Sequence, residues 1–200
     1  GEIMARLESF CEGGRKRAET FEYDVVVVGG GLAGVSAAIQ AARLGVSVAL
    51  IEKESGLGGN SSSLLRLHIL GAHCNHPYAR ETGVVAELEE EAMYYHAFMP
   101  PSGGGQFAYF NSTWSPLVLW KCEEAGVDVF LKNVITDVEV EGSTVSAIGG
   151  YDMFGDRSVR FEGFHSVVDA SGDGVVAYRA GCEFRYGRES RDEFGESFAP

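Results

Sequence analysis

The sequence has no long apolar run and few basic residues. None of its apolar stretches approaches the roughly 20 residues that a membrane-spanning helix needs, and the N-terminal residues lack the apolar region of a secretion signal. Lysine and arginine number 16 against 29 aspartates and glutamates, for a formal net charge of −13. Because this charge repels phosphate backbones and anionic lipids, we expect neither nucleic acid nor a membrane as a partner.

Paired cysteines are absent as well. The four cysteines are far apart and share no spacing typical of a disulfide framework or a zinc site: Cys11, Cys74, Cys122 and Cys182. This pattern favours reduced thiols in a cytoplasmic protein. The segment His73-Cys-Asn-His76 places three potential ligands together, but no further ligand group stands at a suitable spacing, so we predict no metal site.

Glycine is abundant, at 27 residues, and the most informative glycines follow a strand. Val25–Val28 is a continuous β-branched run, which predicts a strand buried on both faces, as in a parallel sheet. The motif Gly29-x-Gly31-x-x-Gly34 comes directly after it. Glycine permits a tight turn at position 29, lets a pyrophosphate approach the backbone at position 31, and lets a helix pack against the strand at position 34.

A helix and a second strand complete a βαβ unit. Small residues at 35–44 predict a helix that ends at Gly45, and its N-terminal N–H groups would face the phosphates of a dinucleotide. Val46–Ile51 is the expected second strand, and Glu52 follows it. A carboxylate about 20 residues after the first glycine is typical of one that binds the adenosine ribose hydroxyls. Glutamate there would repel the 2′-phosphate of NADP.

Two helices are expected in the middle of the chain, after a glycine- and serine-rich loop at 53–63. Thr82–Phe98 has an apolar face and a glutamate-rich face that we expect to be solvated, with Thr82 as its N-cap. A second helix is expected from Ser115, as N-cap, to Ala125, with Gly126 as its stop signal.

Short strands dominate the last third of the chain. Turn signals separate five runs: 127–131, 134–141, 144–151, 158–162 and 165–169. We predict that the last three of these runs form an antiparallel meander. The final run leads into a small-residue turn, Asp169–Gly174, and a helix over 175–180. In this turn Asp173 is either a helix cap or a cofactor contact.

Residues 23–63 resemble the FAD-binding half of the glutathione-reductase-like flavoproteins. Glu52-Lys53 followed by Gly58-Gly-Asn-Ser61 is especially similar to the fumarate reductase and succinate dehydrogenase flavoprotein group. In that group the Gly-Gly-Asn-Ser loop contacts the FAD phosphates, the ribityl chain and the edge of the flavin ring. Asp169-Ala-Ser-Gly-Asp173 resembles the second FAD motif of these proteins, and the resemblance implies that Val134 lies near the adenine.

The resemblance implies FAD as the cofactor. It predicts the cofactor contacts Gly29, Gly31, Leu32, Ala33, Gly34, Glu52, Lys53, Gly59, Asn60, Ser61, Val134, Ala170, Ser171, Gly172 and Asp173. It assigns no catalytic residue. Arg66 and His68 lie just beyond the flavin-side loop and are considered for the base that oxidation of a hydroxyl requires, although a solvated or packed histidine is the more common case.

Several further segments are similar to a bacterial family called FAD-dependent oxidoreductase: Gly71-Ala-His73, Ala79–Gly83, Gly172–Gly174, Ala180–Ser190 and Glu193–Glu196. Members are often associated with carbohydrate use, so the resemblance implies hydride transfer from a small organic, carbohydrate-related substrate to flavin. Such flavoproteins are at least twice as long. The resemblance therefore implies that this chain is the N-terminal part, and that its partner is the remainder of the protein or a second subunit.

The predicted fold is an incomplete α/β, Rossmann-like FAD-binding domain, a parallel sheet with an inserted antiparallel β-meander. Its expected parts are an N-terminal extension at 1–22, the FAD-binding domain at 23–63 and 127–200, and an insertion at 64–126 toward the substrate and flavin side. Two alternatives remain open. One is an NAD-linked dehydrogenase, because the first βαβ unit alone serves either nucleotide. The other is a non-catalytic FAD-binding fragment.

Overall fold

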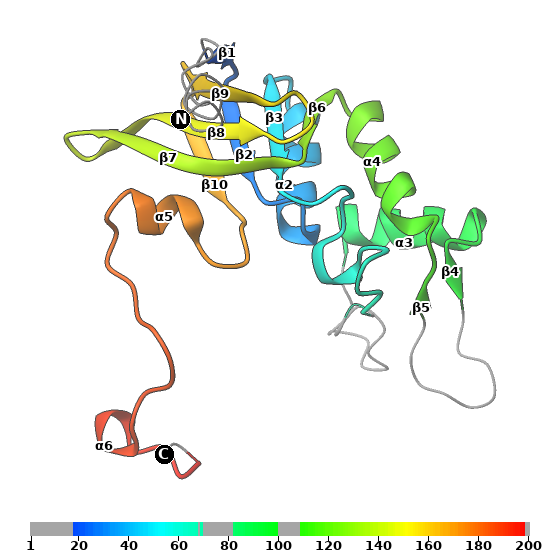
Figure 1. Cartoon of the computed structure of the whole chain (residues 1–200). Coiled ribbons are helices and arrows are strands. Elements are labelled where there is room, and N and C mark those ends of the chain that lie inside the picture. The colour runs from blue at the N-terminus through cyan, green and yellow to red at the C-terminus, as the bar shows by residue number, and fades with distance from the viewer. Residues whose placement is uncertain (1–17, 68, 70–81, 100–108, 199–200) are drawn as a thin grey trace, which may run out of the picture.

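The computed structural model describes residues 18–67, 69, 82–99 and 109–198. At its centre is a parallel sheet with the strand order β10-β2-β3-β6. Its strands are β2 (Val25–Val28), β3 (Val48–Glu52), β6 (Val127–Leu131) and β10 (Ser166–Asp169). Helices cover one face of this sheet and a second sheet covers the other, so the molecule has three layers (Figure 1). The predicted α/β class is confirmed.

The alternation of side chains along the central strands explains the run of four valines. In β2, Val27 packs with Leu50 of β3 in the core beneath the helices, whereas the valines on either side of it belong to the core shared with the second sheet. Both faces of the strand are packed against apolar cores, so every position favours an apolar, β-branched residue. The second strand begins at Val48, two residues later than predicted, and Val46 is 37% exposed.

Three helices form the layer over one face of the parallel sheet: α2 (Leu32–Arg43), α3 (Val84–Tyr94) and α4 (Trp114–Glu124). α3 and α4 come from the segment expected as an insertion, and they share one hydrophobic core with α2 and the sheet. The stop signals after α2 and α4 are confirmed, because Gly45 and Gly126 have φ values of 89° and 85°. This layer is therefore continuous with the dinucleotide-binding unit.

The two predicted N-caps are wrong. α3 begins after Gly83, whose φ of 64° favours glycine, so Thr82 lies outside the helix. In α4 the N-cap is Thr113, and Ser115 lies inside the helix. The Ser115 hydroxyl accepts a hydrogen bond of 2.9 Å from the backbone N–H of Ser63, a tertiary contact that the local sequence pattern does not reveal.

α3 also ends earlier than predicted. The helix stops at Tyr94, His96 adopts a left-handed φ of 52°, and the chain then forms a short antiparallel pair of strands, β4 (Phe98–Met99) and β5 (Tyr109–Phe110). The expectation that the glutamate-rich face is solvated fails at Glu89, which is only 7% exposed. Helix ends depend on tertiary contacts as well as on periodicity, and so they are the least predictable part of an element.

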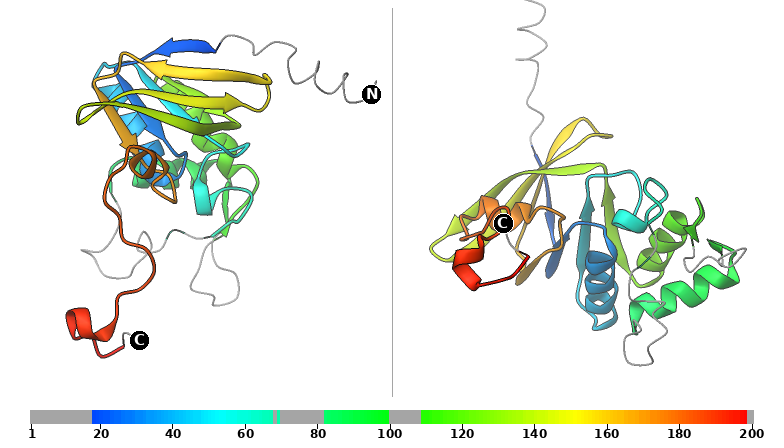
Figure 2. Two further views of the ribbon diagram at one scale, coloured as in Figure 1. Left: turned by 60° about the vertical axis from the view of Figure 1, so that its left-hand side comes forward. Right: turned by 90° about the horizontal axis from the view of Figure 1, so that it is seen from below.

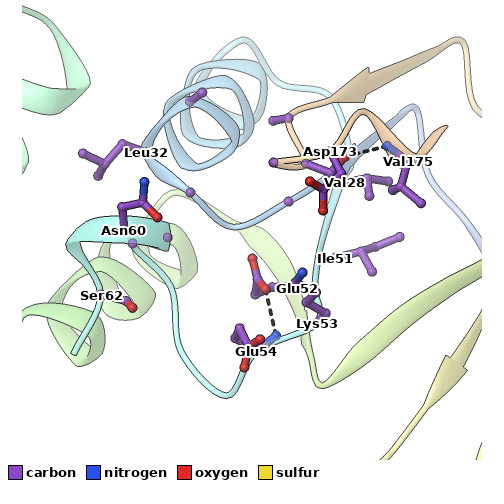
Figure 3. Close-up of a pocket in the computed structure, with 18 of the residues that line it drawn as sticks. Val28, Leu32, Ile51, Glu52, Lys53, Glu54, Asn60, Ser62, Asp173 and Val175 are labelled. Atoms are coloured by element: carbon purple, nitrogen blue, oxygen red, sulfur yellow. Dashed lines mark hydrogen bonds between the residues drawn. The ribbon is translucent and has the colours of Figure 1, made fainter. Parts of the chain in front are cut away.

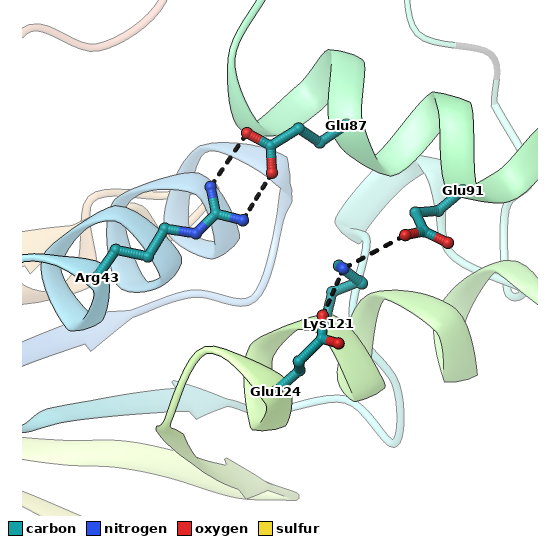
Figure 4. A network of polar contacts seen from close by, with 5 residues as sticks. All are labelled: Arg43, Glu87, Glu91, Lys121 and Glu124. Atoms are coloured by element: carbon teal, nitrogen blue, oxygen red, sulfur yellow. Dashed lines mark hydrogen bonds and ion pairs between the residues drawn. The ribbon is translucent and has the colours of Figure 1, made fainter.

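Ion pairs link the three helices (Figure 4). Glu87 of α3 accepts two hydrogen bonds, of 2.6 and 3.1 Å, from the guanidinium of Arg43 in α2. Lys121 of α4 lies 2.5 Å from Glu124 in its own helix and 3.5 Å from Glu91 of α3. Two of the glutamates expected to be solvated therefore join α3 to its neighbours. Because such pairs are partly exposed, each contributes little to stability, and the shared apolar core supplies most of it.

The second sheet is a meander with one parallel strand at its edge. β7 (Asn133–Glu141), β8 (Thr144–Asp152) and β9 (Arg157–Glu162) pair antiparallel in sequence order. The predicted meander is wrong by one strand, because β10 pairs in parallel with β2 in the central sheet. β1 (Glu19–Glu22), within the segment expected as an extension, pairs in parallel with β9. Short apolar runs look alike in sequence, and only tertiary packing selects their partners.

After β10 the chain forms α5 (Val175–Arg179) at the place of the helix predicted over 175–180, and Gly181, with a φ of 78°, follows it. All residues at 181–198 are exposed, including the short α6 (Arg191–Phe194), and this segment extends away from the three layers (Figure 2). Among the described residues, no helix has the length and apolar character to cross a membrane. The predictions for His68 and for residues 70–81 fall outside the described residues.

Candidate functional site

A cavity of about 980 Å³ opens at the carboxyl ends of β2, β3 and β10 (Figure 3). Every predicted cofactor contact except Gly34 lines it. In Figure 3, Leu32 and Asn60 lie on one side of the cavity, and Glu52 and Asp173 come from other segments. Ligands of open α/β sheets bind at this edge, and the volume is in the range of small-molecule and cofactor sites. Segments far apart in the sequence therefore meet in one cavity.

Packing within the protein requires two glycines of the motif. Gly29 has a φ of 107°, and a Cβ there would lie 2.5 Å from the carbonyl oxygen of Ala170. A Cβ on Gly34 would lie 1.8 Å from the carbonyl oxygen of Gly29. The motif thus keeps three segments in contact: the turn after β2, the start of α2 and the turn after β10. Gly34 has the packing role that its spacing predicts, away from the cavity wall.

Gly31 differs, because no contact within the described protein requires a glycine there. Its φ of −69° suits any residue, and the atom nearest to a Cβ would be the Cα of Gly59, at 4.0 Å. Gly31 lines the cavity at the N-terminus of α2. The N–H groups of a first helical turn have no partner within the helix, and together with the helix dipole they favour an anion. This part of the cavity therefore fits the pyrophosphate of a dinucleotide.

The glycine-rich loop after β3 returns to the same place. The N–H of Gly58 donates a 2.8 Å hydrogen bond to the carbonyl of Gly30, and Gly58 forms an isolated parallel bridge with Gly31. The short helix η1 (Gly59–Ser61) follows, and Gly58 and Gly59 have φ values of 114° and 56°. A Cβ on Gly59 would lie 2.9 Å from the Cα of Gly31. The two loops can come this close because Gly59 has no side chain at the contact.

The two polar residues of η1, Asn60 and Ser61, have different surroundings. Asn60 is exposed and lines the cavity. Ser61 also lines it but is only 4% exposed, and its hydroxyl donates to the carbonyl of Gly58 at 2.8 Å and accepts from Nε1 of Trp114 at 2.9 Å. Asn60 therefore offers its side chain to a ligand, whereas the Ser61 hydroxyl is already engaged within the protein.

Glu52 ends β3 with a buried carboxylate, 8% exposed, that borders the cavity. Its Oε2 accepts a 2.6 Å hydrogen bond from the N–H of Gly30, and its Oε1 accepts one of 2.7 Å from the N–H of Glu54. Each carboxylate oxygen has a further acceptor site, so the group can bind a ribose hydroxyl while it holds both loops. Lys53, the next residue, is exposed and lines the cavity.

Asp169 and Ser171, and not Asp173, cap α5. The Asp169 carboxylate accepts hydrogen bonds from two N–H groups in the first turns of α5, both at 2.9 Å, and Ser171 Oγ accepts a third at 2.8 Å. Burial raises the pKa of Asp169, but hydrogen bonds from Ser171 and from the helix outweigh it, so this pKa lies below its usual value. The exposed Asp173 lines the cavity, and its side chain makes no hydrogen bond to any described residue. Its predicted role as a cap is wrong, and its role as a cofactor contact stays a prediction.

The start of β7 forms another part of the wall. Val134, which pairs with Tyr151, lines the cavity together with Asn133 and Ile135. Asn133 is 5% exposed, and its Nδ2 donates a 2.9 Å hydrogen bond to the carbonyl of Leu131. Its Oδ1 has no hydrogen-bond partner among the described residues. A buried acceptor without a partner is unfavourable. The Asn133 Oδ1 atom beside Val134 is therefore able to accept a hydrogen bond from a ligand.

Sequence reasoning missed an apolar group in the cavity wall, formed by Leu64, Leu65, Leu67 and Ile69. The apolar character of this segment was its only signal, and it did not distinguish a cavity wall from an ordinary core. Arg66 lies within the same segment, yet it is exposed and is not part of the wall, and its Nε donates to the carbonyl of Ser63 at 3.4 Å. Arg179 of α5 also lines the wall without having been predicted.

The described residues contain no group of three histidine, cysteine or acidic side chains that could hold a metal ion. Cys122 and Cys182 are free thiols, the first buried and the second exposed. The segment His73–His76 falls outside the described ranges.

Residues 24–200 match the family model described as FAD dependent oxidoreductase. The chain belongs to this family. The cofactor of the protein is therefore FAD, and the family and cofactor expected from the resemblance are confirmed. The NAD-linked alternative loses its support, because the shared βαβ unit was its only basis.

Curated relatives of this flavoprotein include the aerobic glycerol-3-phosphate dehydrogenase of Staphylococcus epidermidis, which is 33% identical over 112 residues. The enzyme of the same name from Staphylococcus aureus is 31% identical over 112 residues. Both alignments cover 50% of this chain and 19% of the relative. The chain thus spans about a fifth of the length of the curated relatives it matches.

Solved structures share the fold of this flavoprotein. A geranylgeranyl bacteriochlorophyll reductase-like protein from Thermoplasma acidophilum has a TM-score of 0.56 at 20% identity, with 82% of this chain and 43% of that chain covered. A flavoprotein/dehydrogenase from Cytophaga hutchinsonii has a TM-score of 0.57 at 20% identity, with coverages of 84% and 44%. These likenesses place the three layers within the Rossmann-like fold of FAD-binding proteins.

Proposed function

We propose that this flavoprotein binds FAD along the cavity and forms the cofactor-binding part of an oxidoreductase that removes a hydride from a small, carbohydrate-related substrate. The observation that carries the proposal is the surroundings of Gly31. Its backbone needs no glycine, no described atom would clash with a Cβ there, and it borders the cavity at the start of α2. A ligand that must approach the backbone closely explains a glycine that the fold itself does not require.

The cavity wall provides a different chemistry for each part of FAD. Gly31 and the N–H groups at the start of α2 bind the pyrophosphate. Glu52 accepts hydrogen bonds from the adenosine ribose, while Val134 and Asn133 lie beside the adenine. Asn60 and the apolar group serve the flavin side. The other predicted contacts in the wall complete the path of the cofactor: Gly29, Leu32, Ala33, Lys53, Gly59, Ser61, Ala170, Ser171, Gly172 and Asp173.

Backbone dipoles are the main source of positive potential for the pyrophosphate. The wall carries three acidic residues, Glu52, Glu54 and Asp173, against two basic ones, Lys53 and Arg179, and the whole chain has a formal net charge of −13. An anionic cofactor would be repelled by such a wall unless a local dipole compensates. The N-terminus of α2 supplies that dipole at the point where glycine leaves the backbone open.

Bound FAD supplies the redox chemistry, since its flavin accepts a hydride from a carbon of the substrate. The residues of this chain orient the cofactor, bind its charged groups and keep part of it away from water. The substrate class rests on the Staphylococcus relatives, which are named for glycerol 3-phosphate. We place the protein in the cytoplasm, with a further segment of its own chain or a second subunit as partner. Its acidic charge disfavours nucleic acid and membrane partners.

The visible absorption spectrum of the purified protein, before and after addition of FAD and gel filtration, tests the cofactor part of the proposal. We expect flavin bands that remain with the protein. Failure to retain FAD, with the protein folded by circular dichroism, would contradict it. Anaerobic addition of glycerol 3-phosphate and of other small polyols then tests the reaction, because oxidation of a substrate reduces the flavin and bleaches its visible bands.

A non-catalytic FAD-binding unit is the second candidate function. It is favoured by the coverage of the curated relatives, of which the chain spans about a fifth. Such a unit would retain flavin whose visible bands are bleached by dithionite but not by any of the polyols tested. Bleaching by any polyol on the time scale of turnover would exclude this alternative.

A further inference from the structure

The first turn of α4 holds the cofactor loop 58–63 through two adjacent side chains. Nε1 of Trp114 donates a 2.9 Å hydrogen bond to the hydroxyl of Ser61. Oγ of Ser115 accepts a 2.9 Å hydrogen bond from the backbone N–H of Ser63. The two bonds span 53 and 52 residues of sequence. Local loop chemistry therefore does not account for either bond, and each depends on the docking of α4.

The loop also lies close against this turn of the helix. A Cβ on Gly58 would lie 3.1 Å from Nε1 of Trp114, and a Cβ on Gly56 would lie 3.3 Å from the Cβ of Ser115. The Ser61 hydroxyl links the indole of Trp114 to the backbone of the loop, because it accepts a hydrogen bond from the indole and donates one to the carbonyl of Gly58. The position of the helix thus determines the position of the left-handed turn that starts η1.

α4 is a rigid support for these contacts. Trp114 is completely buried, and its ring stacks on Phe110 with centroids 4.1 Å apart and an interplanar angle of 25°. Val118 and Cys122, on the same side of the helix, are also completely buried in the core beneath α2. A displacement of the first turn of α4 would disrupt this packing, so the indole N–H is held in place by the core and not by the loop.

The opposite side of the loop faces the cavity. Gly59 approaches Gly31 so closely that a Cβ on Gly59 would lie 2.9 Å from the Cα of Gly31, and Asn60 is exposed in the cavity wall. The loop is therefore enclosed between α4 and the site assigned to FAD. We propose that Trp114 and Ser115 are positioning residues, which act through Ser61 and Ser63 to set η1 against the cofactor. This inference rests on the proposed function, because it assigns the loop to the flavin side of FAD.

Binding measurements on the full chain test the positioning role. Ser115→Ala and Trp114→Phe each remove one hydrogen bond, and we expect each to weaken FAD binding about ten-fold, the effect of one buried bond. The visible bands of the bound flavin should also shift in both variants. In a Ser61→Ala background, Trp114→Phe should cause no further loss, because the indole acts through Ser61. Ser36→Ala is the matched control, since Ser36 Oγ is buried, has no hydrogen-bond partner among the described residues and lies on α2. FAD affinities and spectra equal to those of the wild type in both variants would overturn the proposal.

A second measurement needs no FAD and separates this inference from the proposed function. Amide hydrogen exchange of the FAD-free chain should speed up in peptides covering 56–67 in Ser115→Ala, while peptides covering β2 exchange as in the wild type. Unchanged exchange in the loop would overturn the positioning role even if FAD binds. If the wild type fails to retain FAD while the loop exchange responds, the proposed function fails and the mechanical link between α4 and the loop stands.

Discussion

The backbone N–H of Gly30 donates a 2.6 Å hydrogen bond to Oε2 of Glu52, so the carboxylate that ends β3 holds the turn that follows β2. Oε1 of the same carboxylate accepts a hydrogen bond from the N–H of Glu54 at 2.7 Å. The residue expected to bind the adenosine ribose therefore also joins two loops of the cavity wall. We therefore expect this one side chain to affect both the stability of the site and its affinity for the nucleotide.

Glu52→Gln should destabilise the FAD-free protein. Glutamine has one acceptor oxygen, so its amide NH₂ would face one of the two N–H groups that Glu52 now accepts, and a buried donor without an acceptor costs about 1–3 kcal/mol. Urea unfolding followed by circular dichroism measures this difference. Glu54→Gln is the matched control, because the Glu54 side chain is 47% exposed and lies 3.7 Å from Lys132, so we expect a loss below about 1 kcal/mol. Equal unfolding midpoints for the wild type and Glu52→Gln would contradict the prediction.

Gly31→Ala and Gly34→Ala should separate binding from folding. Among the described residues, a Cβ on Gly31 would meet only the Cα of Gly59, at an ordinary contact distance of 4.0 Å, so the thermal midpoint of this variant should stay close to that of the wild type while FAD retention is lost. A Cβ on Gly34 would lie 1.8 Å from the carbonyl oxygen of Gly29, so this variant should lose both folding stability and FAD. Thermal unfolding of the FAD-free proteins and gel filtration with FAD check both outcomes. Tight flavin binding by Gly31→Ala would show that the pyrophosphate lies elsewhere.

Asp169→Asn should destabilise the protein at neutral pH but have less effect in acid. The folded-state pKa of Asp169 lies below its usual value of 3.8, so its stabilising contribution is complete above about pH 4 and disappears as the pH falls through the folded-state pKa. The difference in unfolding free energy between the variant and the wild type should therefore be constant from pH 5 to 8 and shrink below about pH 4. Urea unfolding at each pH measures it, with Asp173→Asn as a control at an exposed position. A difference in unfolding free energy that grows as the pH falls below about 4 would contradict the prediction.

The two described cysteines should react at very different rates. Burial, with a smaller effect of Glu123, raises the pKa of the Cys122 thiol to about 12, and the residue is completely buried. Because the thiolate is the reactive form, we expect iodoacetamide to modify the exposed Cys182 in the native protein and to leave Cys122 unmodified until unfolding. Peptide mass spectrometry after labelling at pH 8, with and without urea, checks this order. Rapid native labelling of Cys122 would mean that α4 opens locally.

Much of the site was predictable because its chemistry is local in sequence. The βαβ unit, the spacing of its glycines and the carboxylate at Glu52 follow one another within 30 residues, and each has a backbone reason that acts over short range. The same holds for Gly45 and Gly126, whose positive φ values end helices. Such features can be recognised in one sequence without knowledge of the distant contacts.

The errors concern polar residues that satisfied a local rule while another residue filled the role. Ser115 looked like a helix cap, but its hydroxyl is used by the N–H of Ser63. Asp173 was considered as a cap, whereas Asp169 and Ser171 cap α5 and leave Asp173 at the cavity. In each case several polar residues satisfied the local rule, and the folded structure selected among them.

The central strand, the dinucleotide turn and the family could be recognised from the sequence alone, because a buried β-branched run and three spaced glycines have few other uses. Three features became visible in the folded chain: β10 returns to the parallel sheet beside β2, β1 joins the meander beside β9, and the indole of Trp114 donates a hydrogen bond to Ser61. Hydrogen-bonding partners between strands, and contacts between side chains more than 50 residues apart, depend on which surfaces become buried together. The choice of partner for each strand and side chain is therefore made by the fold as a whole and not by the local sequence.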